Sequence, residues 1–153
     1  MRTSRRITSP VIAIAIAAAI TASLAGCSGT IPDTLGVTGG KLPPCPDKPN
    51  CVVSHNYDET HHIAPLVYSG ELSDAYSELL ADIEKMPGSA IITKNERYIH
   101  AEFTSSLMRY VDDVEFYFDT ENKQIELRSA SRLGHSDMGV NRERIEALRE
   151  IQK

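Results

Sequence analysis

Positive charge is scarce in this sequence outside its first six residues. The 153 residues include 16 Lys and Arg against 21 Asp and Glu. Loss of residues 1–26 would remove Arg2, Arg5 and Arg6 but no acid, leaving 13 basic against 21 acidic residues and a net charge of −8. Phosphate binding needs a dense cationic surface. The balance therefore argues against nucleic acid as a partner and against electrostatic attachment to anionic lipid headgroups.

Catalytic signatures are also lacking. There is no Gly-x-Ser-x-Gly motif, which excludes a nucleophile elbow of that type. His135, Ser136 and Asp137 include the residue types of a triad, but sequence neighbours rarely form one, because a triad is a spatial arrangement. Asp112 and Asp113 would point to opposite faces of a strand and so could not easily act as a dyad. The catalytic residues stay unknown, and no cofactor is expected.

The amino terminus carries an uncharged, mostly apolar run, Val11–Ala22, after its basic residues. The run is too short for a membrane span and ends at Leu24–Cys27, "LAGC", as in a secretory signal. The motif resembles the bacterial lipobox. This resemblance implies that the chain is cut before Cys27, that the thiol is diacylated and that the new amine is acylated. An ordinary cleaved signal with a chance cysteine is the alternative.

The expected domain organisation follows from this cleavage. Residues 1–26 are a lipoprotein signal peptide, residues 27–44 a flexible tether with Gly, Thr and Pro, and residues 45–153 one small domain. Acyl chains such as palmitate would anchor the protein, at about 0.8 kcal/mol for each buried methylene. Ser28 favours outer-membrane sorting, by resemblance. The expected location is the periplasmic side of the outer membrane in a Gram-negative host, otherwise the outer face of the cell membrane.

Two further cysteines, Cys45 and Cys51, lie close together in "CPDKPNC". In an exported chain such a pair is interpreted first as a disulfide. Free thiols are one alternative, and a metal site that also uses His55 and His61 or His62 is another. Zinc sites favour two to four residues between cysteines. Because this pair is separated by five, no metal is expected.

Periodicity predicts an α+β fold. Apolar residues at helical spacing from Leu72 to Met86 indicate an amphipathic helix. Alternating residues predict strands at Ala90–Thr93, Tyr98–Ser105, Val111–Asp119 and Gln124–Ser131. A last helix begins near Asn141, whose side chain is expected to cap it. The prediction is an antiparallel sheet of three to five strands, with one helix before the meander and one C-terminal helix packed on it.

Four blocks of this sequence resemble one known family. They are "CPDKPNCV", "IAPLVY", "LMRYVDDVEFYFD" and "RSASRLGHSDMGVNRERIEALR", and they extend from Cys45 almost to the carboxyl end. In this order they resemble the domain of unknown function 1499 family (DUF1499). The resemblance implies an envelope or plastid protein, often exported or membrane-attached, and brings no settled activity. The chain reads "CVVSHN" where family members read "CVSS", so no role is carried over to that serine.

Five arginines lie in the last block and the residues around it, Arg128 to Glu150. One hypothesis is an anion or carboxylate pocket, since paired arginines and a helix amino terminus can receive such groups. Its candidate ligand-binding residues are Arg128, Ser129, Ser131, Arg132, Asp137, Asn141 and Arg142, with supporting carboxylates Asp112, Asp113 and Glu115.

A structural network is the competing interpretation of the same residues. Arg128 would pair with Glu115 or Glu102 across the sheet, worth about 0.2 to 1 kcal/mol if exposed. Asp137 would cap the loop and hold Arg132. His100, on the strand of Glu102, is expected at the surface.

The functional prediction is a lipid-anchored cell-envelope protein that acts as a binding or assembly module with an Arg/Asp-rich site. Its partners would be the membrane, through the lipid anchor, and an envelope protein or a small anionic ligand. The alternative is an envelope enzyme, a hydrolase or transferase, that uses the same polar cluster.

Overall fold

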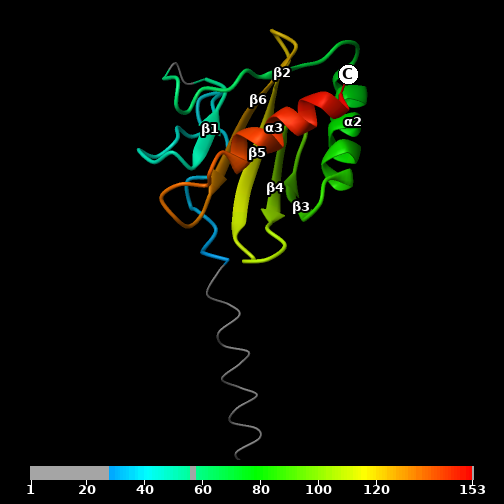
Figure 1. Cartoon of the computed structure of the whole chain (residues 1–153). Helices are drawn as coiled ribbons and strands as arrows, with labels where there is room; N and C mark the ends of the chain where they lie inside the picture. Colours follow the sequence, from blue (N-terminus) through cyan, green and yellow to red (C-terminus); the bar gives the residue numbers. More distant parts are fainter. Residues whose placement is uncertain (1–27, 56–57, 153) are drawn as a thin grey trace, which may run out of the picture.

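The computed structural model describes residues 28–55 and 58–152, which form one sheet with two helices on one of its faces (Figure 1). The expected signal peptide and Cys27 lie outside the described residues. The elements follow in chain order as β1 (Cys51–Val53), β2 (Leu66–Val67), α2 (Leu72–Lys85), β3 (Ser89–Lys94), β4 (Tyr98–Thr104), β5 (Val111–Asp119), β6 (Gln124–Ser131) and α3 (Val140–Ile151).

The sheet is antiparallel, with the strand order β1-β6-β5-β4-β3 and with β2 paired to the start of β6. Hairpins join β3 to β4, β4 to β5 and β5 to β6, as the alternating segments predict. The predicted α+β fold is confirmed. The bounds of β5 and β6 agree with the predicted ones, because each strand alternates without interruption and ends at a polar turn.

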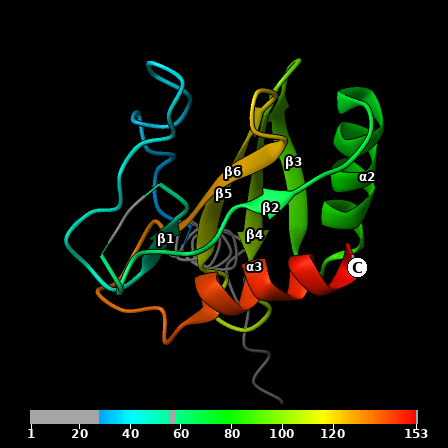
Figure 2. The same ribbon diagram turned by 90° about the horizontal axis from the view of Figure 1, so that it is seen from above.

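One face of the sheet carries the hydrophobic core and is covered by α2 and α3 (Figure 2). The stripe Ala75, Leu79 and Ile83 of α2 is buried, as are Ile145 and Leu148 of α3. Burying one such leucine contributes about 1.5–3 kcal/mol. The strands supply the other side of this core through Ile99, Ala101, Phe103, Val114, Phe116, Phe118, Ile125 and Leu127.

The start of α3 differs from the prediction. Gly139 precedes the helix at φ 88°, in the left-handed region that glycine adopts without strain. Asn141 lies inside the first turn and makes no capping hydrogen bond, so its predicted capping role is wrong. Asp137 takes this role instead. Its carboxylate accepts from the amides of Gly139 at 3.0 Å and Asn141 at 2.8 Å.

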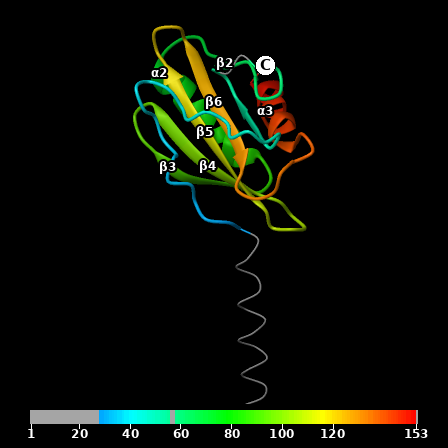
Figure 3. The ribbon, with the colours of Figure 1, turned by 90° about the vertical axis from the view of Figure 1, so that its left-hand side faces the viewer.

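The opposite face of the sheet is crossed by an irregular segment, residues 29–42, called the strap below (Figure 3). The amide of Gly36 donates to Oε1 of Glu115 in the middle of β5, at 2.7 Å. Leu42, near the end of the strap, is buried. This part of the segment expected as a flexible tether therefore lies against the sheet.

Candidate functional site

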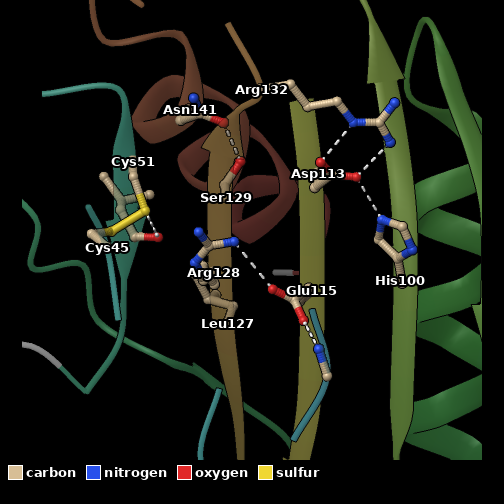
Figure 4. A network of polar contacts seen from close by, with 12 residues as sticks. Cys45, Cys51, His100, Asp113, Glu115, Leu127, Arg128, Ser129, Arg132 and Asn141 are labelled. Carbon is tan, nitrogen blue, oxygen red and sulfur yellow. Dashed lines mark hydrogen bonds and ion pairs between the residues drawn. A yellow bond between two sulfur atoms is a disulfide. The ribbon is translucent and has the colours of Figure 1, made fainter. Parts of the chain in front are cut away.

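The predicted pocket residues of β6 lie on two opposite faces of the sheet. Successive side chains of a strand alternate between its faces. Arg128 consequently lies on the strap face, whereas Ser129 points to α3 (Figure 4). Ser131 also lies on the helix side, where its Oγ accepts from Asn141. Arg132, just after the strand, lies on the strap face with Arg128. The structure brings together two separate polar networks rather than one pocket.

The strap-face network contains a cluster around Asp113. The Nε and Nη2 atoms of Arg132 donate to the two carboxylate oxygens of Asp113, at 2.8 and 2.7 Å. His100 Nε2 contacts Oδ1 of the same carboxylate at 2.8 Å. Arg132 also pairs with Glu102. Such a fork-to-fork contact is among the stronger ion pairs, and Asp113 is only 1% exposed.

A second cluster on the same face is centred on Glu115, which is fully buried. Nη1 of Arg128 donates to its Oε2 at 3.2 Å, and the Tyr98 hydroxyl donates to its Oε1 at 2.8 Å. With the amide of Gly36, this carboxylate has donors from two strands and the strap. Nε of Arg128 has no hydrogen-bond partner among the described residues. Glu115 therefore ties the strap to the sheet.

Burial and hydrogen bonds within the strap-face network shift the pKa values of its ionisable side chains. Burial alone would raise the pKa of Asp113, but the hydrogen bonds from Arg132 and His100 outweigh it and lower the pKa below its usual value. The hydrogen bond to Asp113 raises the pKa of Arg132. Burial, and then the charge of Glu115, raise the pKa of Tyr98. The ion pairs are thus stabilised in their charged form.

The helix-face network is built around Asn141. Its Nδ2 donates to the Asn50 carbonyl at 3.1 Å and to Ser131 Oγ at 3.1 Å, while its Oδ1 accepts from Ser129 and from Arg144. Arg144 then reaches Asp112 Oδ2 at 2.5 Å. This network connects the first turn of α3 to β5, to β6 and to the residue before β1.

The remaining arginines of the carboxyl-terminal run bind backbone carbonyls. Arg142 donates to His62 O at 2.7 Å and Thr60 O at 3.0 Å. Arg149 donates to Pro65 O at 2.9 Å, and to Ala64 O. The predicted contact between Asp137 and Arg132 is not made, because Asp137 receives the amides of α3. All five arginines of the run are engaged within the domain. The structural interpretation predicted that Arg128 pairs with Glu115 or Glu102, and the structure shows the pair with Glu115.

Cys45 and Cys51 form the predicted disulfide, with their Cα atoms 5.7 Å apart. Among residues 28–55 and 58–152, no group of three or more His, Cys, Asp or Glu side chains could hold a metal ion. His61 contacts Asp58 at 2.6 Å and the Lys48 carbonyl at 3.0 Å. The hydrogen bond that His61 donates to the Asp58 carboxylate raises the pKa of His61. This histidine thus connects two loops near the disulfide.

One important residue, Arg144, was missed by sequence reasoning, although a signal for it exists. Arg144 shares a helical stripe with Asn141, Ile145 and Leu148, at positions i, i+3, i+4 and i+7. Polar residues in a core stripe indicate a buried partner. The partner of Arg144 is Asp112, which lies two residues before Val114 and on the same core side of β5.

His100 was expected at the surface and is buried, with 3% exposure. That prediction is wrong, because alternation identifies the face of a side chain but not what covers that face. The strap that runs over this face comes from residues distant in sequence from β4.

A cleft of ≈ 550 Å³ lies beside Arg144 and not at the strap-face network. Its walls come from the end of α2, the loop between β4 and β5, and the start of α3, including Phe103, Arg109 and Val140. Arg144 stacks over the Phe103 ring at 4.8 Å. The residues best suited to acid–base or anion chemistry, Asp113 and Arg132, are covered, so the arrangement is suited to bracing the sheet.

The lowered pKa of Asp113 predicts acid sensitivity. Since the folded pKa lies below that of the unfolded chain, the carboxylate stabilises the fold fully above about pH 4. This stabilisation is lost as pH falls through the folded pKa. We expect the free energy of unfolding, measured in denaturant from pH 6 to pH 3, to fall more steeply for the wild type than for Asp113→Asn. Equal slopes would contradict a charged Asp113 paired with Arg132 and His100.

Comparison with known families matches residues 41–151 to the family described as "Protein of unknown function (DUF1499)". The match covers both helices and every strand of the described residues, and all the side chains of both polar networks, while Gly36 of the strap lies outside it. Among curated proteins, none matches the chain. In the described part of the chain, no helix is long and apolar enough to cross a bilayer.

Proposed function

Since the chain belongs to the DUF1499 family, whose description assigns no activity, we propose its function from its own residues. It is a lipid-anchored protein of the cell envelope that acts as a binding or assembly module. The observation that carries this proposal is "LAGC", Leu24–Cys27, directly after a basic and then apolar leader. The Cys45–Cys51 disulfide supports it, because such bonds persist in oxidising compartments.

The location follows from the anchor. Acyl chains on Cys27 hold the domain at the periplasmic side of the outer membrane in a Gram-negative host, or at the outer face of the cell membrane otherwise. The net negative charge of the mature chain supports attachment by buried acyl chains rather than by attraction to anionic lipids.

The polar networks favour a module over an enzyme. Arg128 and Arg132 are neutralised by carboxylates of the same domain, and the strap lies over the sheet face that bears them. An anionic ligand would have to displace both Glu115 and Asp113. The networks therefore hold the surfaces of the domain in place. A partner binds at a part of these surfaces away from Arg128 and Arg132.

An envelope enzyme is the second candidate, and the contact between His100 and Asp113 favours it. A histidine oriented by a carboxylate is a common general base. Both side chains are buried, so a substrate would reach them only if the strap moved.

Replacing Cys27 with serine tests the proposed anchor. We expect the wild type to sediment with membranes after an alkaline wash, and its intact mass to fit a chain that starts at Cys27 and carries acyl groups. The Cys27→Ser variant should lose both properties, because a hydroxyl does not accept the thioether-linked lipid. Ser28→Ala, next in the chain, is the matched control and should keep both. A wild-type product that retains residues 1–26 and has no acyl adduct would overturn the proposal.

A further inference from the structure

Exposed large apolar side chains gather at one end of the domain. The loop between β4 and β5, residues 105–110, presents Leu107, which is 86% exposed. The loop between β6 and α3, residues 132–139, presents Met138, which is 93% exposed. Exposed apolar side chains beside them complete a set that we call the apolar end: Leu107, Met108, Tyr110, Leu133, Met138 and Val140.

The strand register places these two loops side by side. Thr104 and Val111 pair at the mouth of the first loop, and Asp112 pairs with Ser131 at the start of the second. The amide of Arg132 donates to the Val111 carbonyl at 3.2 Å. Figure 1 shows both loops at the same end of the sheet, where the described chain begins.

The chain enters the domain at this same end. A Cβ built on Gly29 would lie 2.9 Å from Cβ of Arg132 and 3.3 Å from Cγ of Leu133, so the backbone of Gly29 contacts the second loop. Cys27 is two residues earlier. Consecutive Cα atoms are about 3.8 Å apart, so the Cα of Cys27 lies within roughly 8 Å of Gly29. Acyl chains on Cys27 would therefore start next to the apolar end.

The most exposed apolar side chains of the loops have no evident part in the fold. Met138 adopts φ 58°, a left-handed conformation that Gly or Asn accepts more readily than Met. Leu107 and Met138 contribute little to the core, since both are almost fully exposed. Clustered exposed apolar groups indicate an interaction surface. Arg109, between Met108 and Tyr110 in the first loop, is exposed, and its side chain is suited to the headgroup region of a bilayer.

We infer that the apolar end is a second, non-covalent contact with the lipid bilayer that anchors the protein. Leu107 and Met138 insert at the interface next to the acyl chains of Cys27. This rests on the proposed lipid anchor. The bilayer then fixes the orientation of the domain. The opposite end of β6, where Val67 pairs with Gln124, points away from the membrane.

Site-directed spin labels on the full acylated protein test the insertion. With Cys27 acylated and Cys45 bonded to Cys51, an introduced cysteine is the one thiol open to labelling. We would label Leu107→Cys, Met138→Cys and, as the control, Val67→Cys, which is 74% exposed. The protein is reconstituted in vesicles of phosphatidylethanolamine and phosphatidylglycerol. We expect labels at 107 and 138 to lose collisions with a water-soluble nickel complex and gain collisions with oxygen, while the label at 67 remains as in solution.

The outcomes separate this inference from the proposed anchor. If the mass shows acyl chains but all three labels stay equally water-accessible, the membrane contact is wrong and the anchor stands. If no acyl chains are found, the proposed anchor fails and the inference fails with it. Labels that are exposed in vesicles but protected in native envelopes would assign the apolar end to a protein partner and overturn the inference.

A substitution series supplies the second test. In the background Leu107→Ser with Met138→Ser, a label at Met108→Cys should regain its collisions with nickel. In the matched background Val67→Ser with Ile92→Ser, two exposed apolar residues outside the apolar end, the label should stay protected. Protection that survives the first background would count against insertion through these side chains. Circular dichroism checks that each background folds.

Discussion

Replacing Arg132 with methionine should lower the free energy of unfolding by about 3–5 kcal/mol, because it leaves a buried charge without its partner. Asp113 is 1% exposed and receives two of its hydrogen bonds from Arg132. Methionine fills much of the volume of the arginine stem, so loss of packing contributes little. Equilibrium unfolding in guanidinium chloride, monitored by circular dichroism at neutral pH, measures the change.

The matched control is Arg109→Met. Arg109 is exposed, so its replacement should change stability by less than about 0.5 kcal/mol. Adding Asp113→Asn to Arg132→Met should recover part of the loss, since a neutral amide can still hydrogen-bond His100 without needing a cation. A loss as small as that of Arg109→Met, or a double variant weaker than the single one, would show that the ion pair is not what stabilises this face.

The Arg132 result also bears on the pocket hypothesis. A ligand-binding arginine keeps charge available for a ligand, and its replacement often leaves the free protein stable. An arginine whose charge is used inside the domain behaves in the opposite way. A large loss of stability would identify the cluster as a brace of the sheet, in line with the proposed module.

Most of the sheet could be predicted from the sequence because the period-two signal of the strands is local. Val114, Phe116 and Phe118 alternate with acidic and aromatic neighbours, and this pattern alone defines β5 and its core face. The same alternation in neighbouring strands limited the predicted partner of Arg128 to Glu115 or Glu102, and Glu115 is the partner observed.

The single pocket predicted to contain both Arg128 and Ser129 is wrong, and alternation is the physical reason. These neighbours in β6 cannot reach one ligand from opposite faces of a sheet. Asn141 was predicted in the pocket because it was expected to start the helix, whose amino terminus can receive an anion. In the structure the turn at Gly139 assigns capping to Asp137 and leaves Asn141 facing the sheet.

The strap could not be predicted, because its contacts are distant in sequence. Gly36 and Glu115 are 79 residues apart. The strap has no periodicity that distinguishes it from a flexible coil. Composition rich in Gly, Thr and Pro describes both a tether and an irregular segment that packs through its backbone. His100 and Tyr98 are both buried on the sheet face that the strap crosses.

Replacing Asn141 with leucine should lower the free energy of unfolding by about 3 kcal/mol, because a similar volume without polar atoms deprives several buried groups of one hydrogen bond each. Asn141 is itself buried. Its loss removes one of the hydrogen-bond partners of the Asn50 carbonyl, of Ser129 and of Arg144. Chemical unfolding measures the total. Hydrogen exchange should also rise at Cys51–Val53, since Asn141 holds the residue directly before β1.

The control is Asn122→Leu, which removes a side-chain hydrogen bond of the same chemistry to Asp119 but at an exposed turn. Its cost should stay near 0.5 kcal/mol, because water replaces the lost partner. If Asn141→Leu costs no more than Asn122→Leu, the hydrogen bond between Arg144 and Ser129 is sufficient without Asn141. If stability falls but exchange in β1 does not change, Asn141 stabilises α3 alone. A residue that joins α3, β6 and β1 affects an edge strand from within a helix. Its replacement should therefore cause both a large loss of stability and faster hydrogen exchange at β1.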